Sequence, residues 1–65
     1  MKIMVNGEPR EVASTRLDEA LAELGYGCAR VATAVNERFV PAAARAGRSL
    51  ADGDRLEVLA PRQGG

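Results

Sequence analysis

One amphipathic helix is the feature that most limits what this chain can fold into. Leu17, Ala20, Leu21 and Leu24 recur at the i, i+3, i+4, i+7 spacing of a single helical face. Burying the three leucines contributes roughly 5–9 kcal/mol before the loss of chain entropy is counted. Gly25 follows this face and favours the left-handed backbone conformation in which a helix commonly ends. The 65 residues suffice for one small domain, so the remaining chain has to cover this face.

The residues before this apolar face predict where the helix begins. Ser14 and Thr15 are both suited to the N-cap, where a hydroxyl accepts a hydrogen bond from a free backbone amide. Thr15 with Asp18 three residues later resembles a capping box, and Asp18 and Glu19 favour the positive end of the helix dipole. We therefore expect the helix to be capped by Ser14 or Thr15.

A β-hairpin is predicted ahead of the helix. Residues 1–5 and 8–12 are strand candidates, and Asn6-Gly7 between them favours a type I′ turn, which needs positive φ at both positions. Pro9 has no amide hydrogen to donate to a ladder, which places the second of these strands at an edge of the sheet.

A second pair of strands is predicted after the helix. Residues 30–35 form one candidate, residues 36–38 the turn, and residues 39–40 the returning strand, which Pro41 ends. Residues 42–46 are expected to make a short helical turn ended by Gly47. Residues 55–59 alternate polar and apolar side chains for most of their length, which indicates a half-buried last strand.

The order of these elements predicts an α+β fold. A mixed sheet of four to five strands would pack on one main helix, with the first and last strands side by side and parallel near the centre of the sheet. This is the ubiquitin-like β-grasp arrangement. Residues 1–60 would form the domain, and residues 61–65 would form a flexible C-terminal tail.

The residue inventory argues against an enzyme. The chain has no His, the commonest general base and metal ligand, and its one Cys cannot build a zinc site. Nine basic residues balance nine acidic ones and aromatic residues are 3%, so neither nucleic acid nor an anionic membrane is a favoured partner. We expect no bound metal or cofactor. The absence of a leader and of a long apolar run favours a cytoplasmic location.

Three residues outside the tail have both a structural and a functional interpretation. Cys28 is expected to be a small, partly buried loop residue, and less readily a thiol that exchanges sulfur. Asp52 and Asp54 flank a glycine in a predicted tight turn and supply too few oxygens to hold calcium.

Met4 and Leu59 are candidates for a partner-binding surface. If Ile3 and Val5 face the helix, Met4 points to the other face of the sheet, and Leu59 is an apolar residue at an outward position. Since the first and last strands are expected to be neighbours, these two side chains could share one exposed patch.

Two glycines, Gly64 and Gly65, end the sequence. A terminal carboxylate is ionised and a poor electrophile, so it reacts only after activation, most simply as an acyl-adenylate. Glycines can thread through a narrow enzyme cleft and adopt backbone angles closed to other residues. The pattern is typical of a chemical handle on a folded domain, although it is also compatible with an incidental tail.

The whole chain resembles the ThiS family, the small sulfur carriers of thiamine biosynthesis. The residues that carry the resemblance are Asn6-Gly7, Thr15, Ala34-Val35-Asn36, Val40-Pro41, Asp52-Gly53-Asp54 and Gly64-Gly65. The resemblance implies that the terminal glycine is adenylated, converted to a thiocarboxylate, and donates its sulfur during thiazole formation.

The resemblance also implies site residues and partners. Gly65 would bear the adenylate and then the sulfur, and the partner-binding residues would be Arg62, Gln63 and Gly64, together with Leu59 and Met4. The partners would be an E1-like adenylating enzyme that consumes ATP, a thiazole synthase, and a sulfur-donating enzyme such as a cysteine desulfurase. Alternatives are the small subunit of molybdopterin synthase, a ubiquitin-like protein modifier, and a β-grasp interaction module.

Overall fold

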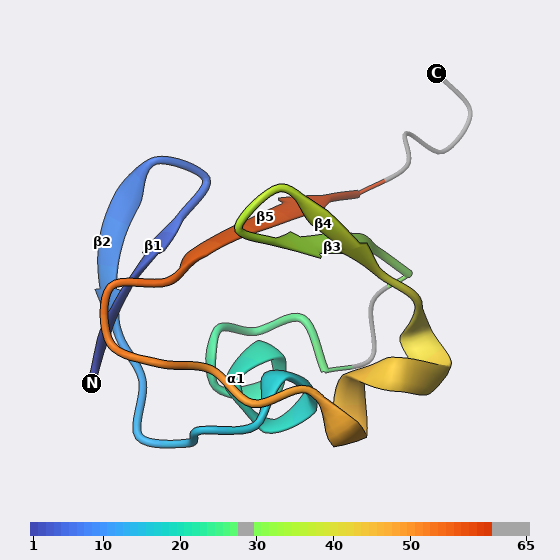
Figure 1. The fold of residues 1–65 in the computed structure, drawn as a ribbon, viewed down its shortest axis with the longest axis horizontal. Helices are drawn as coiled ribbons and strands as arrows, with labels where there is room; N and C mark the ends of the chain where they lie inside the picture. Colours follow the sequence, from blue (N-terminus) through green and yellow to red (C-terminus); the bar gives the residue numbers. More distant parts are fainter. Residues whose placement is uncertain (28–29, 61–65) are drawn as a thin grey trace.

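In the computed structural model, which describes residues 1–27 and 30–60, a five-stranded sheet lies over one helix (Figure 1). The elements are β1 (Lys2–Val5), β2 (Glu8–Glu11), α1 (Leu17–Glu23), β3 (Ala32–Val35), β4 (Arg38–Val40), the 3-10 helix η1 (Ala42–Gly47) and β5 (Arg55–Leu59). The strand order is β2-β1-β5-β3-β4, with β1 parallel to β5 and the other neighbours antiparallel. The predicted α+β architecture, with a mixed sheet on one main helix and β2 at an edge, is confirmed.

The core lies between α1 and one face of the sheet. Leu17, Ala20 and Leu21 of α1 are buried, and Leu24 packs against them from the helix end. The strands supply alternate residues, as a sheet with one covered face must. The buried side chains outside the helix are Ile3, Val5, Val12, Thr33, Val35, Val40, Leu50, Leu56 and Val58.

The start of α1 differs from the prediction. The helix begins at Leu17 with Arg16 in the N-cap position, and no side-chain hydrogen bond caps it, so capping by Ser14 or Thr15 is wrong. The carbonyl of Thr15 accepts from the amide of Leu50 at 2.6 Å, and Arg16 forms an isolated bridge with Ser49. This pairing with a distant segment holds the approach to the helix in an extended conformation.

The end of α1 follows the prediction. Gly25 has φ +96°. The amide of Gly25 donates to the carbonyl of Ala22 at 3.1 Å, and the amide of Tyr26 donates to the carbonyl of Leu21 at 2.8 Å. These two bonds make a Schellman motif, which uses carbonyls that a helix end leaves free.

Two hairpins of the same kind flank β5 in the sheet. The turn between β1 and β2 has φ 51° at Asn6 and 85° at Gly7, and the turn between β3 and β4 has φ 51° at Asn36 and 71° at Glu37. Both are the positive-φ turns that suit the twist of a hairpin. Predicted strand ends differ by one or two residues, and Gly47 belongs to η1 instead of ending it.

The turn before β5 has the structural role that we expected. Gly53 has φ +88°. The carboxylate of Asp52 accepts from the amide of Lys2 at 2.8 Å, and that of Asp54 accepts from the amide of Ala51 at 2.8 Å. Within residues 1–27 and 30–60, no group of three or more potential metal ligands lies together. Nor is any helix of this part of the chain long and apolar enough to cross a membrane.

Candidate functional site

The central strand β5 leads directly to the predicted reactive end. Leu59 is its last residue, and Ala60 is the last residue that the structure describes on this side. The predicted site residues Arg62, Gln63, Gly64 and Gly65 lie outside the described residues, as do Pro61 and Cys28, so the roles assigned to them stay predictions. The site that can be built is the end of β5 and the surface around it.

Strand β3 holds β5 along one edge over its last four residues. The antiparallel register pairs Leu56, Glu57, Val58 and Leu59 with Val35, Ala34, Thr33 and Ala32 in turn. The other edge is held differently, because β1 pairs with β5 only through Met4 with Arg55 and Val5 with Leu56. Beyond that point the side chain of Asn6 contacts β5. Its Nδ2 donates to the carbonyl of Val58 at 3.1 Å, and its Oδ1 accepts from the amide of Val58 at 2.8 Å.

Apolar side chains are exposed on the sheet face opposite α1, beside the end of β5. Leu59 is 73% exposed and Phe39 is 69% exposed. Paired residues point to the same face of a sheet, and Ala32 is the partner of Leu59 while Ala34 is the partner of Phe39. We call these four residues (Ala32, Ala34, Phe39 and Leu59) the outer apolar patch.

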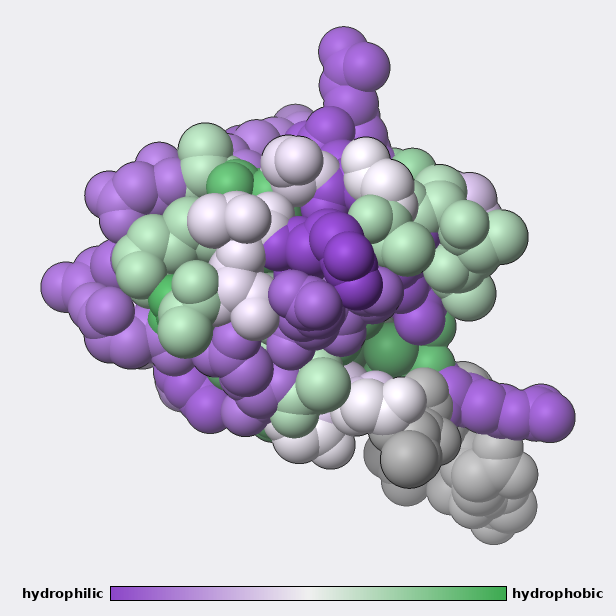
Figure 2. All heavy atoms as spheres, turned by 90° about the horizontal axis from the view of Figure 1, so that it is seen from below, coloured by the Kyte–Doolittle hydropathy of each residue, from purple (hydrophilic) through white to green (hydrophobic). Residues whose placement is uncertain are grey.

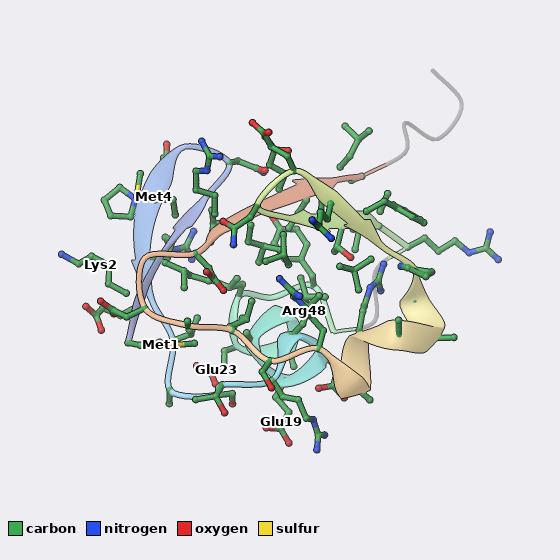
Figure 3. All side chains as sticks on the ribbon, in the orientation of Figure 1. Met1, Lys2, Met4, Glu19, Glu23 and Arg48 are labelled. Atoms are coloured by element: carbon green, nitrogen blue, oxygen red, sulfur yellow. The ribbon has the colours of Figure 1, made fainter. Side chains whose placement is uncertain are left out.

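Met4 does not belong to the outer apolar patch. It is half-buried on β1, and in Figure 3 its side chain points away from α1. Its partners in the sheet are Pro9 on β2 and Arg55 on β5. Leu59 lies four positions after Arg55, which is about 13 Å along a strand. The prediction that Met4 and Leu59 share one patch is therefore wrong, although both lie on the outer face.

Phe39 is the residue of this surface that sequence reasoning missed. The signal was present, because Val40 is the buried residue of β4 and its neighbour Phe39 has to point outward. A groove of about 310 Å³ adjoins the patch at the end of β5. Among the described residues it is lined by Arg30, Val31, Ala32 and Leu59.

The opposite side of the molecule has a different character. Figure 2 shows the side on which α1 lies, where hydrophilic and weakly apolar residues alternate and strongly hydrophobic atoms appear only in small areas between them. The large hydrophobic side chains with high exposure, Phe39 and Leu59, instead belong to the outer face of the sheet. The outer face is therefore the better candidate for contact with another protein.

The shifted titratable groups in the described part of the chain serve turns and helix ends. Hydrogen bonds from the Ala51 amide and the Asn36 side chain lower the pKa of Asp54, which precedes β5. Hydrogen bonds from the Ser14 hydroxyl and the Ala13 amide lower the pKa of Glu23. These carboxylates hold backbone in place, which is a structural role and not acid–base catalysis.

A model of the ThiS family matches residues 3–65. The chain belongs to the ThiS family. Sulfur carrier protein ThiS of Thermus thermophilus is 40% identical over 63 residues, which cover 97% of this chain and 98% of that protein. A crystal structure of thiamine biosynthesis protein ThiS from Geobacter metallireducens superposes with a TM-score of 0.83 at 30% identity, with full coverage of both chains.

A longer relative is also similar. Thiazole synthase of Paramagnetospirillum magneticum is 39% identical over 66 residues, which cover 100% of this chain and 20% of that protein. The chain therefore spans one fifth of the length of this relative. The ThiS relatives confirm the β-grasp fold and the membership of the family, and they support the prediction of a sulfur carrier of thiamine biosynthesis. They favour this prediction over the molybdopterin and protein-modifier alternatives.

Proposed function

We propose that this ThiS chain carries sulfur for the thiazole of thiamine as a thiocarboxylate on Gly65. The observation that supports it is a family match that runs through Gly65 on a domain whose described core ends at Val58. The last residues are thus part of what the family shares.

The chemistry follows from the poor reactivity of a carboxylate. An oxygen of the Gly65 carboxylate attacks the α-phosphate of ATP on a partner enzyme, and pyrophosphate leaves. Hydrosulfide, which a thiol reductant releases from the persulfide of the sulfur-donating enzyme, then attacks the acyl carbon, and AMP leaves. The resulting thiocarboxylate supplies its sulfur to the thiazole. In this proposal the ATP is bound by the adenylating enzyme, and the carrier itself holds no cofactor. The cytoplasmic location stays a prediction.

The partners follow from the same proposal. An E1-like adenylating enzyme activates the terminus, and a sulfur-donating enzyme such as a cysteine desulfurase supplies the sulfur. A thiazole synthase receives it. The match to a segment of a protein named thiazole synthase supports this last partner, because a related domain and that activity then occur in one polypeptide.

The outer apolar patch is the proposed docking surface for the adenylating enzyme. Phe39 and Leu59 each expose more than two thirds of their surface next to the strand that leads to the terminus. Burying two such side chains favours association, and docking there would direct the following residues, Arg62 to Gly65, towards the partner's cleft. Met4 would make a separate contact about 13 Å away along the strands.

Intact-mass measurement tests the carrier function directly. The protein is incubated with its adenylating enzyme, ATP and a sulfur source, and the expected product has the mass of a protein in which sulfur replaces one oxygen. A chain lacking Gly65 should keep its circular-dichroism melt, since the deletion removes nothing from the described core. If that shortened chain still supports thiazole formation, the carrier proposal is wrong.

Gly65→Ala tests whether the adenylating enzyme recognises the small size of the terminal residue. Adenylation requires the carboxylate to be in line with the α-phosphate, and a misplacement of ~1 Å can reduce the rate about 10²-fold. We expect slower pyrophosphate exchange with unchanged binding to the adenylating enzyme. An alanine variant adenylated at the native rate would show that the diglycine is not recognised sterically.

Leu59→Asp and Phe39→Asp test the docking surface. Each should weaken binding to the adenylating enzyme about tenfold or more while the melting temperature changes little, because both side chains are largely exposed. Ala43→Asp, on the exposed η1, is the matched control and should leave binding unchanged. A large loss of stability with unchanged binding would mean that these side chains serve the fold instead.

A further inference from the structure

The side chain of Asn6 occupies the place of a strand residue beside β5. The backbone amide of Asn6 donates to the carbonyl of Leu56 at 2.9 Å, and this is where β1 turns away into its hairpin. The amide group of the side chain then takes both backbone hydrogen bonds of Val58. In Figure 1 the tip of the β1–β2 hairpin lies beside β5, as these bonds require.

We infer that Asn6 is a positioning residue for the sulfur-bearing terminus. Val58 lies between Asn6 on one edge and Thr33 of β3 on the other, and Leu59 and Ala60 follow it directly. With Asn6 in place, the end of β5 is held on both edges, by the side chain of Asn6 at Val58 and by β3 through the pairing of residues 56–59 with residues 32–35. Without it, the end of β5 is held by β3 alone. The inference rests on the proposed function, since it concerns the placing of the Gly65 carboxylate.

The chemistry of the side chain explains why asparagine serves here. The position needs a left-handed backbone for the turn, and asparagine tolerates φ of 51° better than most residues. It also needs one acceptor and one donor on a planar group, which the carboxamide supplies together. An aspartate would accept from the Val58 amide but could not donate to the Val58 carbonyl.

The other hairpin provides an internal control. Asn36 also has φ 51°, and it contacts β5 at the opposite end. Its Oδ1 accepts from the amide of Arg55 at 3.0 Å, and its Nδ2 donates to the carboxylate of Asp54 at 3.0 Å. The two asparagines thus hold the two ends of one strand, but only Asn6 acts next to the terminus.

The test compares Asn6→Gly with Asn36→Gly. Glycine keeps the left-handed turn and removes only the side-chain amide. Amide hydrogen exchange at Val58 should accelerate about tenfold or more in Asn6→Gly, and exchange at Arg55 should do so in Asn36→Gly, relative to the core amide of Leu56. Asn6→Asp should restore part of the protection at Val58, because it keeps the acceptor.

Pyrophosphate exchange with the adenylating enzyme supplies the functional readout. Asn6→Gly should lower kcat about tenfold or more with KM for the carrier unchanged, because the docking surface is intact while the carboxylate is less well placed. Asn36→Gly should retain the wild-type kcat. Equal losses in both variants, or no loss in Asn6→Gly, would overturn the inference.

The two readouts separate the inference from the function on which it rests. If the wild-type protein gives neither pyrophosphate exchange nor a thiocarboxylate, the proposed function fails, and a role in placing the terminus fails with it. If the wild type reacts and exchange at Val58 is unchanged in Asn6→Gly, the function stands and the inference alone is wrong.

Discussion

At the scale of single residues, the two hairpin turns differ in how well their residues tolerate a positive φ. Gly7 at φ 85° is well suited to its position, whereas Glu37 adopts φ 71° in the equivalent place. A side chain in the left-handed region costs about 1–2 kcal/mol. Glu37→Gly should therefore stabilise the protein by about 1 kcal/mol, which raises the melting temperature by about 4–8 °C in a domain of this size. The ion pair of Glu37 with Arg55, at 3.6 Å on the surface, contributes little against this.

The reciprocal change is the control for this prediction. A Cβ added at Gly7 would meet no atom within 4 Å, so Gly7→Ala carries a conformational cost and no steric one. It should lower the melting temperature by a similar amount. A Glu37→Gly variant that melts at the wild-type temperature or below would show that the left-handed backbone at this turn is not strained.

Single residues were predictable where the backbone itself requires them. Asn6, Gly7, Gly25 and Gly53 take the positive φ values that the sequence pattern indicates. The N-cap was not predictable, because the carbonyl of Thr15 bonds to a distant segment that the local sequence does not reveal. The residues of a turn can be predicted from their neighbours along the chain. Pairing with a distant segment, which here takes the place of a helix cap, cannot be predicted in that way.

At the scale of elements, α1 depends on contacts outside itself. It has only seven residues, which is too short for a stable isolated helix. The carboxylate of Glu23 in its last turn accepts from the amides of Ala13 and Ser14 at 2.8 Å and 2.9 Å. In Figure 3 Glu23 lies at the flank of α1, beside the segment that leads from β2 into the helix. This contact ties the segment between β2 and α1 to the far end of the helix.

The contact of Glu23 predicts a pH-dependent stability. Hydrogen bonds from Ser14 and Ala13 lower the pKa of Glu23 from its ordinary value of 4.5. A lowered pKa means that the stabilisation is complete above about pH 4.5 and is lost as the pH falls through the lower, folded value. Glu23→Gln should therefore melt below the wild type at pH 7, and the difference should shrink in acid.

The control is Glu19→Gln, which removes a carboxylate from the same helix and leaves the loop amides bonded to Glu23. Its melting temperature relative to the wild type should not follow this profile. A constant gap between wild type and Glu23→Gln from pH 7 down to pH 2 would contradict a role for the ionised carboxylate.

Elements were predictable in kind and order, and less so in their ends. β5 was predicted with its observed bounds, because polar and apolar residues alternate over most of its length. β3 begins at Ala32 and not at residue 30, since Ala32 pairs with Leu59, the last residue of β5. The length of a strand is set by its partner, which one segment of sequence does not contain.

At the scale of the whole molecule, the register between distant strands decided what sequence reasoning missed. Met4 and Leu59 were each correctly placed on the outer face, yet the parallel pairing of β1 with β5 sets them four residues apart. The same pairing brings Asn6 to Val58, a contact that no local pattern indicates. The alternation of polar and apolar residues predicts on which face of the sheet a side chain lies. Its neighbours on the next strand depend on the register between the strands, which the turn before β5 helps to fix.

The whole molecule also keeps its amines away from the proposed reactive end. Lys2 is the single lysine among 65 residues, beside eight arginines. Its carbonyl accepts from the amide of Gly53 before β5 begins, which places it about 20 Å along the strands from Leu59. The α-ammonium of Met1 donates to the carbonyl of Val12 at 2.8 Å. Figure 3 shows Met1 and Lys2 together near the start of β1.

This placement predicts that a lysine beside the end of β5 would be acylated by the carrier's own terminus. Arg30 is exposed and lines the groove next to Leu59, and a guanidinium is not a nucleophile at neutral pH. In Arg30→Lys, the deprotonated ε-amine would attack the acyl carbon of the Gly65 adenylate, AMP would leave, and an amide would form. Five residues follow Ala60, enough chain to reach ~16 Å.

The measurement is the intact mass after incubation with the adenylating enzyme and ATP, with no sulfur source. Arg30→Lys should accumulate a species lighter than the free protein by one water, because forming an internal amide removes one water. Trypsin should then release a branched peptide in which the side chain at position 30 is joined to Gly65. Arg10→Lys, exposed on the edge strand β2 far from the end of β5, is the matched control and should give only the unmodified mass. If Arg30→Lys forms no such species while its adenylation proceeds at the wild-type rate, the scarcity of lysine has no protective role, and the enzyme's cleft alone shields the activated terminus.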